Sequence, residues 1–493
     1  MSYAKRAIKG TTTVFIISII AAFIGYIIRM VLSRNLTPAE YGLFFSVFTL
    51  IHFIAIFKDL GLSSALVKFI PEFQVKKTLG RIKNGIVIVL GFNLISSIVI
   101  AMIIFFTSNI LAEHYFKDSL AIPVLGLFAI ILIVSSFKDT LRNLFNAFQR
   151  MLPFSLMYLL ENSFILIFIM VFFYFKLSIL SPVFAYLASF ILLFFVFLPF
   201  FLKIYPYFKF KFKFSPQLTK KMFKFGIPLT LAGIGSTVIL YTDTLILTYF
   251  RPLQEVGIYN VVVPTAMLLD FFNKSVSQVM FPMISELWAK NLKAYVASAV
   301  ILLQKYSFVL VVPAALIMFS FPGLLLRLLF GEAYASGTLA LQLLVIGLVF
   351  FVVAGINMTV FAGIGKPEIS TKIILIGALV NFLTNFYFIP KYGMIGAAIT
   401  SLASYFLILV LSAFYLTKFI KIIIPWLSWI KIFFSGAVFV LVIYLFKVLL
   451  QMNPYLEAVI SIIIAGAVYI GLIFLFKVAD LAEIRSLLKR GND

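Results

Sequence analysis

The sequence has no cysteine among its 493 residues and two histidines, His52 and His114. Disulfide and thiolate chemistry are therefore excluded, and so is a metal site rich in His or Cys. Acidic residues are also scarce, with 17 Asp and Glu against 40 Lys and Arg. The sequence contains no P-loop motif that would indicate ATP hydrolysis. We predict no resident metal and no cofactor, although carboxylates could still hold a coupling cation.

Charged residues make up 12% of the chain and hydrophobic residues 63%, whereas soluble proteins average about 25% charged residues. A membrane-spanning helix needs about 20 mostly apolar residues. The runs are too long and too little alternating for barrel strands. We therefore predict an all-α polytopic membrane protein. Fourteen segments fit this length, at about 11–33, 41–66, 84–107, 120–143, 152–175, 179–202, 225–249, 256–281, 297–320, 338–362, 369–389, 393–417, 427–450 and 455–477.

Lysine and arginine are distributed unevenly between the connections. If the N-terminus is cytoplasmic, 29 of the 40 basic residues fall on the cytoplasmic side and seven on the outer side. This asymmetry predicts a plasma-membrane protein with both termini in the cytoplasm. The first apolar segment is too long for a signal-peptide core, so we expect it to be retained. The net charge of +23 then reflects topology, and no nucleic-acid partner is expected.

The segment from Lys203 to Pro228, KIYPYFKFKFKFSPQLTKKMFKFGIP, contains seven lysines and no acid. It separates two long apolar halves. Its alternating Lys and Phe residues have the period of a strand, but we expect no strand here. A basic and aromatic segment between two spans is typical of a cytoplasmic linker lying on anionic lipids.

The two halves also share sequence features, which indicates an internal repeat. EYGLF at 40–44 corresponds to EVGIY at 255–259, and Asp59 corresponds to Asp270. We interpret the chain as two parallel six-helix lobes with two further helices. The predicted domains are an N-lobe at 1–205, a basic cytoplasmic linker at 206–224, a C-lobe at 225–420, and helices thirteen and fourteen with a C-terminal tail at 421–493.

Several stretches carry a family resemblance: LSRNLTPAEYGLF, DLGLSSALVKFIPEF, TDTLILTYFRPLQEVGIYNV, LFGEAYASGTLALQLL, and the Gly-Lys-Pro and YGMIGAA motifs between residues 365 and 398. With its two lobes, the chain resembles the polysaccharide transporter branch of the multidrug/oligosaccharidyl-lipid/polysaccharide (MOP) exporter superfamily. That branch includes Wzx-type flippases. The resemblance implies a MATE-like fold and a flippase that moves a polyprenyl phosphate- or pyrophosphate-linked oligosaccharide to the outer leaflet by alternating access, in surface polysaccharide or glycan biosynthesis.

Two other functions were weighed. A cation-coupled multidrug exporter of the same superfamily is disfavoured, because many such exporters carry an aspartate in the first helix, where this chain has only Arg29 as a charge. A membrane glycosyltransferase or polymerase is disfavoured because the outer loops are short, so we expect no enzyme activity. The energy source stays open between membrane potential, protons and sodium. The expected partners are the lipid-linked oligosaccharide, anionic lipids and enzymes of the same pathway, and a monomer is expected.

Ionisable residues inside membrane spans are costly and are candidates for function. Arg29 is the leading candidate for a phosphate contact, which the resemblance supports, although it could also lie at the membrane interface. The other candidates for contact with the cargo or its cavity are Lys58, Lys138, Arg142 and Lys305. The candidates for coupling or for ion pairs inside the membrane are Asp59, Glu161, Asp243, Asp270 and Lys274.

Some of these residues also have structural interpretations. Lys58 and Asp59 are adjacent and should have different partners. Asp139 could pair with Arg142 at i+3, and Glu161 could pair with a basic residue of its lobe. Asp270 and Lys274 are spaced for an ion pair along one helix.

Overall fold

The computed structural model describes residues 3–420, 426–449 and 452–479, with side chains from residue 13 onward. Within these ranges, 13 helices are long and apolar enough to cross a membrane. One of them, α14 (Pro367–Phe419), has 53 residues and contains Gly393 at φ 56° and ψ −135°, a non-helical conformation. Because α14 bends there, it supplies two of the predicted spans, and the predicted total of fourteen is confirmed.

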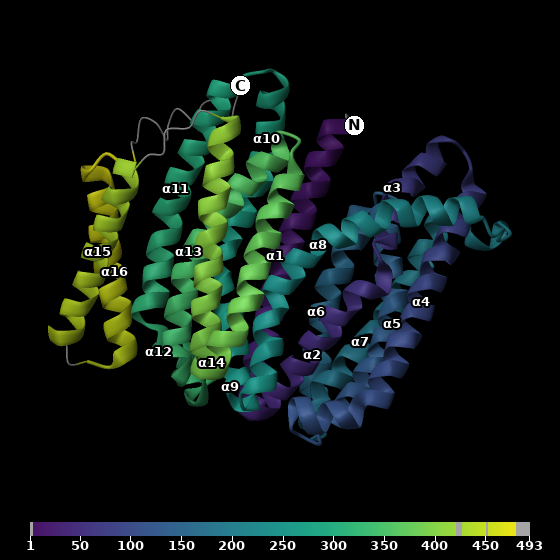
Figure 1. The fold of residues 1–493 in the computed structure, drawn as a ribbon, viewed down its shortest axis with the longest axis horizontal. Coiled ribbons are helices and arrows are strands. Elements are labelled where there is room, and N and C mark those ends of the chain that lie inside the picture. Colours follow the sequence, from purple (N-terminus) through teal and green to yellow (C-terminus); the bar gives the residue numbers. More distant parts are fainter. Residues whose placement is uncertain (1–2, 421–425, 450–451, 480–493) are drawn as a thin grey trace. The chain divides into compact units, whose positions relative to one another are not determined.

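The chain forms two compact units, residues 1–257 and 258–493 (Figure 1). Helix α9 (Leu253–Ala266) runs from the first into the second. Unit 1 contains α1 (Tyr3–Asn35), α2 (Pro38–Asp59), α3 (Leu62–Val75), α4 (Leu79–Ile110), the π-helical turn η1 (Leu111–Phe116), α5 (Ala121–Ala147), α6 (Met151–Tyr174), α7 (Leu180–Ile204), η2 (Tyr207–Lys209) and α8 (Pro216–Phe250).

Unit 2 continues from α9. It contains η3 (Met267–Leu269), α10 (Asp270–Ala289), α11 (Lys293–Ser320), α12 (Pro322–Phe330), η4 (Glu332–Gly337), α13 (Thr338–Gly363), α14, α15 (Trp426–Leu449) and α16 (Pro454–Leu475). Helices α15 and α16, yellow in Figure 1, pack side by side. Helix α8 begins before residue 225 and lies in unit 1, so the lobe boundaries drawn from the repeat remain a prediction. The C-terminal tail from residue 480 lies outside the described residues.

The helices expose many large apolar side chains. Phe106 is 77% exposed, Phe195 65% and Ile463 65%. Contiguous exposed apolar surface of this kind is unusual for a water-soluble monomer. The exposed faces are those expected of helices surrounded by lipid, which agrees with the multi-pass membrane assignment.

The start of α2 is fixed by local hydrogen bonds. The Thr37 hydroxyl accepts from the Glu40 backbone N at 3.2 Å, and the Glu40 carboxylate accepts from the Thr37 backbone N at 2.9 Å. This is a capping box, and Pro38 occupies the first helical turn. Glu40, the acid of the repeated EYGLF motif, therefore caps α2. Its counterpart Glu255 lies in the first turn of α9 and pairs with Arg251 at 2.7 Å.

The second predicted span, 41–66, was wrong as a single helix. Helix α2 ends at Asp59, Leu60 and Gly61 adopt positive φ of 45° and 72°, and α3 starts at Leu62. The Asp59 carboxylate caps α3 by accepting from the Ser63 backbone N at 3.1 Å and its hydroxyl at 2.7 Å. The repeat-related helix is interrupted too: the 3-10 turn η3 separates α9 from α10, which begins at Asp270. Asp59 and Asp270 thus share a position at a helix break.

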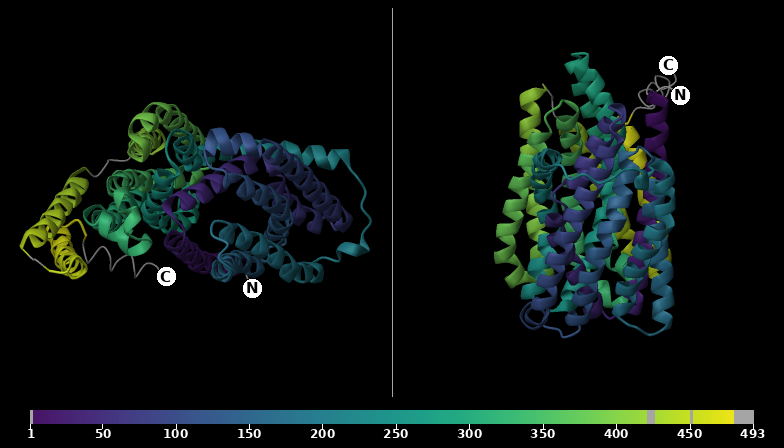
Figure 2. Two further views of the ribbon diagram at one scale, coloured as in Figure 1. Left: turned by 90° about the horizontal axis from the view of Figure 1, so that it is seen from below. Right: turned by 90° about the vertical axis from the view of Figure 1, so that its right-hand side faces the viewer.

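The linker between α7 and α8 is extended from Phe210 to Ser215 and forms no strand, as expected. Figure 2 shows it running along the outside of unit 1. The Tyr205 ring stacks on Phe210 with centroids 5.6 Å apart. The Lys83 ammonium donates to the Phe210 carbonyl at 2.6 Å, and the Tyr205 hydroxyl donates to the Leu79 carbonyl at 2.9 Å. These contacts hold the linker against the first turns of α4.

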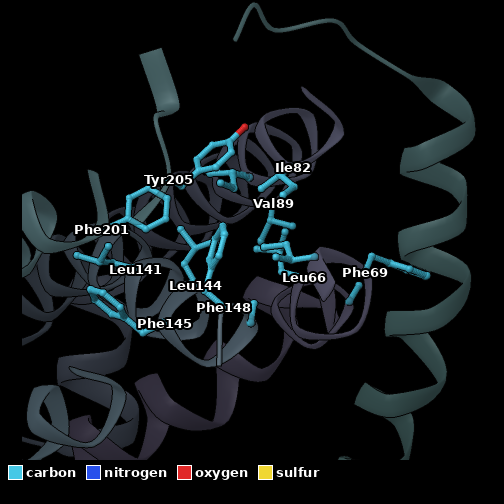
Figure 3. Close-up of a cluster of buried hydrophobic side chains, with 14 of the residues drawn as sticks. Leu66, Phe69, Ile82, Val89, Leu141, Leu144, Phe145, Phe148, Phe201 and Tyr205 are labelled. Atoms are coloured by element: carbon cyan, nitrogen blue, oxygen red, sulfur yellow. The ribbon is translucent and has the colours of Figure 1, made fainter. Parts of the chain in front are cut away.

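A hydrophobic cluster lies beneath this linker (Figure 3). It joins Leu66 and Phe69 of α3 to Ile82 of α4, to Leu144 of α5 and to Phe201 at the end of α7. All five side chains are at most 4% exposed. Burial of a side chain of this size contributes about 1.5–3 kcal/mol, although less where the alternative environment is lipid. The cluster fixes α3, α4, α5 and α7 around the two cavities described below.

Candidate functional site

Three of the predicted intramembrane charges, Lys58, Lys138 and Glu161, form one connected network with Asp139 in unit 1. We call Lys58 of α2, Lys138 and Asp139 of α5, and Glu161 of α6 the charge network. Lys138 Nζ lies 2.8 Å from Glu161 Oε1 and 3.3 Å from Asp139 Oδ1. Lys58 Nζ lies 3.2 Å from Asp139 Oδ2. The network therefore joins α2 to the consecutive helices α5 and α6.

Both lysines of the network are nearly inaccessible, with side chains 7% and 6% exposed. Lys58 also donates to the Ser135 hydroxyl at 2.8 Å, and Lys138 lies 3.7 Å from the centre of the Phe190 ring. A buried ammonium is tolerated when carboxylates and hydrogen-bond acceptors surround it. Two lysines and two carboxylates balance each other, so the network is neutral as a whole.

The charge network lines a cavity of about 270 Å³, which we call the network cavity. At about 30 Å³ per water molecule, it has room for roughly nine waters. Its polar lining groups come from α2, α5, α6 and α7, and aromatic rings form much of the remaining wall. The polar and aromatic lining residues are Phe48, His52, Lys58, Phe128, Ser135, Lys138, Asp139, Tyr158, Glu161, Asn162, Tyr186 and Phe190.

Arg142 lies one turn beyond Lys138 on α5 and differs from the network lysines. Its guanidinium lies 5.0 Å from the ring centres of both Phe154 and Tyr158. In the described part of the chain it forms no ion pair, and its Nε has no hydrogen-bond partner. Asp139 pairs with Lys58 and Lys138. The pair between Asp139 and Arg142 that the i, i+3 spacing predicted does not form. With Arg142 included, three cations face two carboxylates, which leaves one positive charge without a counter-charge.

Two other predicted acids have structural roles. Lys58 and Asp59 have different partners, as expected, since Asp59 caps α3. In unit 2, Asp270 pairs with Lys274 at 3.1 Å and accepts from the Asn273 amide at 3.0 Å. The predicted ion pair along α10 is thereby confirmed.

The remaining candidates lie outside the lining of the network cavity. The Arg29 guanidinium of α1 is half-buried, 4.3 Å from the centre of the Phe45 ring. Asp243 of α8 is buried, with 6% exposure. Lys305 of α11 lies 4.8 Å from the centre of the Tyr306 ring. A role for these three residues in binding or coupling remains a prediction.

Sequence reasoning did not assign His52, Ser135, Tyr158 or Asn162 to the site. The His52 ring stacks on Phe48 at 3.9 Å, and its Nδ1 lies 2.9 Å from the Phe48 carbonyl oxygen. The Asn162 amide donates to the Tyr158 carbonyl at 2.9 Å. The sequence signal that could have identified these residues is that they are polar groups within otherwise apolar spans. Asn162 also directly follows Glu161 in the sequence.

Within unit 1, this arrangement can hold a polar or charged group away from lipid. Among the described residues, no group of three or more His, Cys, Asp or Glu is placed to hold a metal ion.

Known proteins resemble this chain in both sequence and fold. Residues 7–288 match the sequence profile of the family described as "Polysaccharide biosynthesis protein". An uncharacterised membrane protein of Methanocaldococcus jannaschii is 31% identical over 439 residues, covering 85% of this chain and 86% of that protein. The capsular polysaccharide biosynthesis protein CapF of Staphylococcus aureus is 23% identical over 83% of this chain and 99% of its own length.

Among solved structures, the inward closed conformation of the lipid II flippase MurJ has a TM-score of 0.75. It covers 95% of this chain and 98% of its own, at 18% identity. An inward-facing multidrug resistance MATE family transporter has a TM-score of 0.66 at 16% identity and covers 81% of this chain and 94% of its own. These likenesses concern the fold and confirm the predicted MATE-like helical architecture. The profile match covers more than half of the chain. The chain therefore belongs to the polysaccharide biosynthesis protein family.

Proposed function

We propose that this transporter moves an oligosaccharide linked through phosphate or pyrophosphate to a polyprenyl lipid from the cytoplasmic to the outer leaflet, by alternating access. Such a cargo has an anionic head that must be kept from the lipid interior. Its hydrocarbon tail can stay in the bilayer throughout. The protein then needs polar and cationic groups inside the membrane, and it needs no catalytic residues.

The network cavity is the observation that carries this proposal. It places charged, hydroxyl, amide and imidazole groups together inside an apolar helical unit. Charges in spans are expensive, so a cluster of this kind indicates a function beyond packing. Sugar hydroxyls can bond to the carboxylates, the lysines and Asn162, and the aromatic walls can pack against sugar rings.

Arg142 does not line the network cavity, but its guanidinium lies 5.0 Å from the ring centre of Tyr158, which does. It is the cation best suited to the phosphate. Lys58 and Lys138 are already engaged by carboxylates, whereas Arg142 carries the unbalanced positive charge. A guanidinium can bind two phosphate oxygens at once. Arg29 of α1 is the second phosphate candidate. Within the charge network, Glu161 is the candidate for coupling to a proton or another cation.

The test is translocation of a fluorescent polyprenyl-pyrophosphate oligosaccharide in proteoliposomes, with wild type beside Arg142→Gln and Arg29→Ala. We expect wild type to flip the lipid and Arg142→Gln to slow flipping at least tenfold. Arg150→Gln is the matched control, because Arg150 is an exposed cation at the end of the same helical hairpin. It should flip at the wild-type rate.

Two results would contradict the proposal. Folded wild-type protein that flips no lipid-linked sugar but exports small cationic dyes along a proton or sodium gradient would identify a multidrug exporter. Flipping that is unchanged in both Arg142→Gln and Arg29→Ala would keep the function and remove these arginines from the phosphate path.

A further inference from the structure

A second and larger cavity in unit 1 lies apart from the charge network. Its volume is about 890 Å³, and we call it the linker cavity. Four segments form it: the end of α3, the first turns of α4, the extended linker and the first turns of α8. Its lining residues are Phe73, Thr78, Gly80, Arg81, Asn84, Lys211, Lys213, Phe214, Ser215, Pro216, Gln217, Leu218 and Lys221.

The charges around the linker cavity are all positive. Arg81, Lys211, Lys213 and Lys221 line it, and none of its lining residues is acidic. Lys221 also reaches Glu72 at 3.4 Å. The other three form no ion pair in the described part of the chain. Unlike the neutral charge network, this cavity therefore contains three cations, Arg81, Lys211 and Lys213, whose charge is not balanced by a nearby carboxylate within the described ranges.

Two long helices begin at the same cavity. Helix α4 has 32 residues and α8 has 35, and the first turns of both contribute lining residues. The backbone N–H groups of a first helical turn lack partners within the helix and carry partial positive charge. Thr78 supplies no side-chain cap to α4. Phosphate groups bind well at such positions. At α8 the Ser215 side chain already accepts from the Leu218 backbone N, and Pro216 has no N–H. The start of α4 is therefore the helix end that adds to the four cations.

Asn84 supplies a buried polar group at this cavity. The residue is 9% exposed, and its side-chain oxygen accepts from the Lys213 backbone N at 2.9 Å. Its Nδ2 has no hydrogen-bond partner among the described residues, although the residue lines the cavity. This amide nitrogen is a donor that a phosphate oxygen could use. The Asn84 contact also fixes Lys213 at the cavity edge.

The linker residues beside the cavity point to a lipid as the source of the phosphate. Phe208 is 80% exposed and Phe214 62% exposed, and they alternate with exposed lysines. Aromatic rings next to basic residues suit the boundary between head groups and acyl chains. Inorganic phosphate or pyrophosphate would gain nothing from these rings.

We propose that the linker cavity binds the phosphate head group of one anionic membrane lipid. Arg81, Lys211 and Lys213 neutralise the phosphate, Asn84 and the first turn of α4 donate hydrogen bonds to it, and Phe214 lies in the membrane interface beside it. The bound lipid would hold the linker against α4. This site differs from the network cavity, and its binding can be measured without transport of any cargo.

The experiment is native mass spectrometry of the full chain in neutral detergent, titrated with phosphatidylglycerol or phosphatidylcholine. We expect wild type to retain one phosphatidylglycerol at least tenfold more tightly than phosphatidylcholine. The triple variant Arg81→Gln/Lys211→Gln/Lys213→Gln should lose that preference. Asn84→Asp, which keeps the size of the side chain and adds a negative charge, should weaken phosphatidylglycerol binding about tenfold while size-exclusion profiles stay unchanged.

A matched control removes the same number of charges nearby. Lys203, Lys220 and Lys224 are exposed and do not line the cavity, so Lys203→Gln/Lys220→Gln/Lys224→Gln should keep the preference. Equal losses in both triple variants would overturn the site, because they would show attraction by general surface charge. Tight binding of inorganic pyrophosphate, with no preference for phosphatidylglycerol over phosphatidylcholine, would overturn the lipid assignment and indicate a soluble phosphate ligand.

Discussion

The ion pair between Lys138 and Glu161 allows a quantitative test of the charge network. The two charged atoms are 2.8 Å apart, and the side chains are 6% and 15% exposed. Removing one partner of a buried pair costs about 3–5 kcal/mol. Lys138→Met leaves the Glu161 carboxylate with no side-chain partner in the described part of the chain, so a cost of about 4–5 kcal/mol is expected. Glu161→Gln leaves Lys138 with Asp139 at 3.3 Å, so about 3 kcal/mol is expected.

The double variant Lys138→Met/Glu161→Gln removes both charges together. Its loss of stability should fall short of the sum of the single losses by about 2–3 kcal/mol, which is the coupling energy of the pair. The measurement is the free energy of unfolding of all four proteins, titrated with SDS in mixed micelles.

The exposed pair of Lys76 and Glu72 is the matched control, since its charged atoms are also 2.8 Å apart but Lys76 is 60% exposed. Surface pairs contribute little, so Lys76→Met and Glu72→Gln should show no measurable coupling. Two results would refute the argument that burial strengthens the Lys138–Glu161 pair. One is additive losses of stability in the Lys138 and Glu161 variants. The other is an equal coupling energy for the exposed Lys76–Glu72 pair.

Two further predictions concern packing and pH. A Cβ built at Gly42 would overlap the Leu253 backbone carbonyl and lie 2.8 Å from the Gly257 backbone N, so Gly42→Ala should lower the free energy of unfolding by about 1–3 kcal/mol. Gly91→Ala, with open space around it, should instead raise it by about 0.5–1 kcal/mol; a loss there would contradict the steric argument. The hydrogen bond from Lys76, helped by Lys221, lowers the pKa of Glu72. A lowered folded-state pKa gives stability that is present above the unfolded-state value of about 4.3. The small difference in thermal midpoint between wild type and Glu72→Gln should therefore disappear as the pH falls below about 4, and a difference that persists at pH 3 would exclude this origin.

The membrane spans could be predicted because each depends on a local property, a run of about 20 apolar residues. The break between α2 and α3 was missed, because the residues on both sides are equally apolar. The local signal was Asp59 followed by Gly61, a capping acid and a residue suited to positive φ. Hydropathy averaged over a window does not detect such a pair.

The candidate site was predicted in part. The cost of a charge in a span identified Lys58, Lys138 and Glu161 individually. Their meeting depends on how α2, α5 and α6 pack, and residues 58 and 139 are 81 positions apart in sequence. Helical periodicity relates positions within one helix, so it offered Arg142 as a partner of Asp139 but could not reveal Lys58. The linker cavity was not predicted either, because it requires two helix starts to converge.

The distribution of the charge network over the helices also bears on how the protein is made. Each helix enters the membrane in sequence order, and a charge at the centre of a lone inserting helix costs about 2.5–3.5 kcal/mol on the translocon scale. Helices α5 and α6 are consecutive, so Lys138 and Glu161 can pair within one hairpin as soon as it forms. Lys58 of α2 must remain near the membrane surface until α5 brings Asp139. Biogenesis is therefore expected to bring α2 into its final position late, after the α5–α6 hairpin.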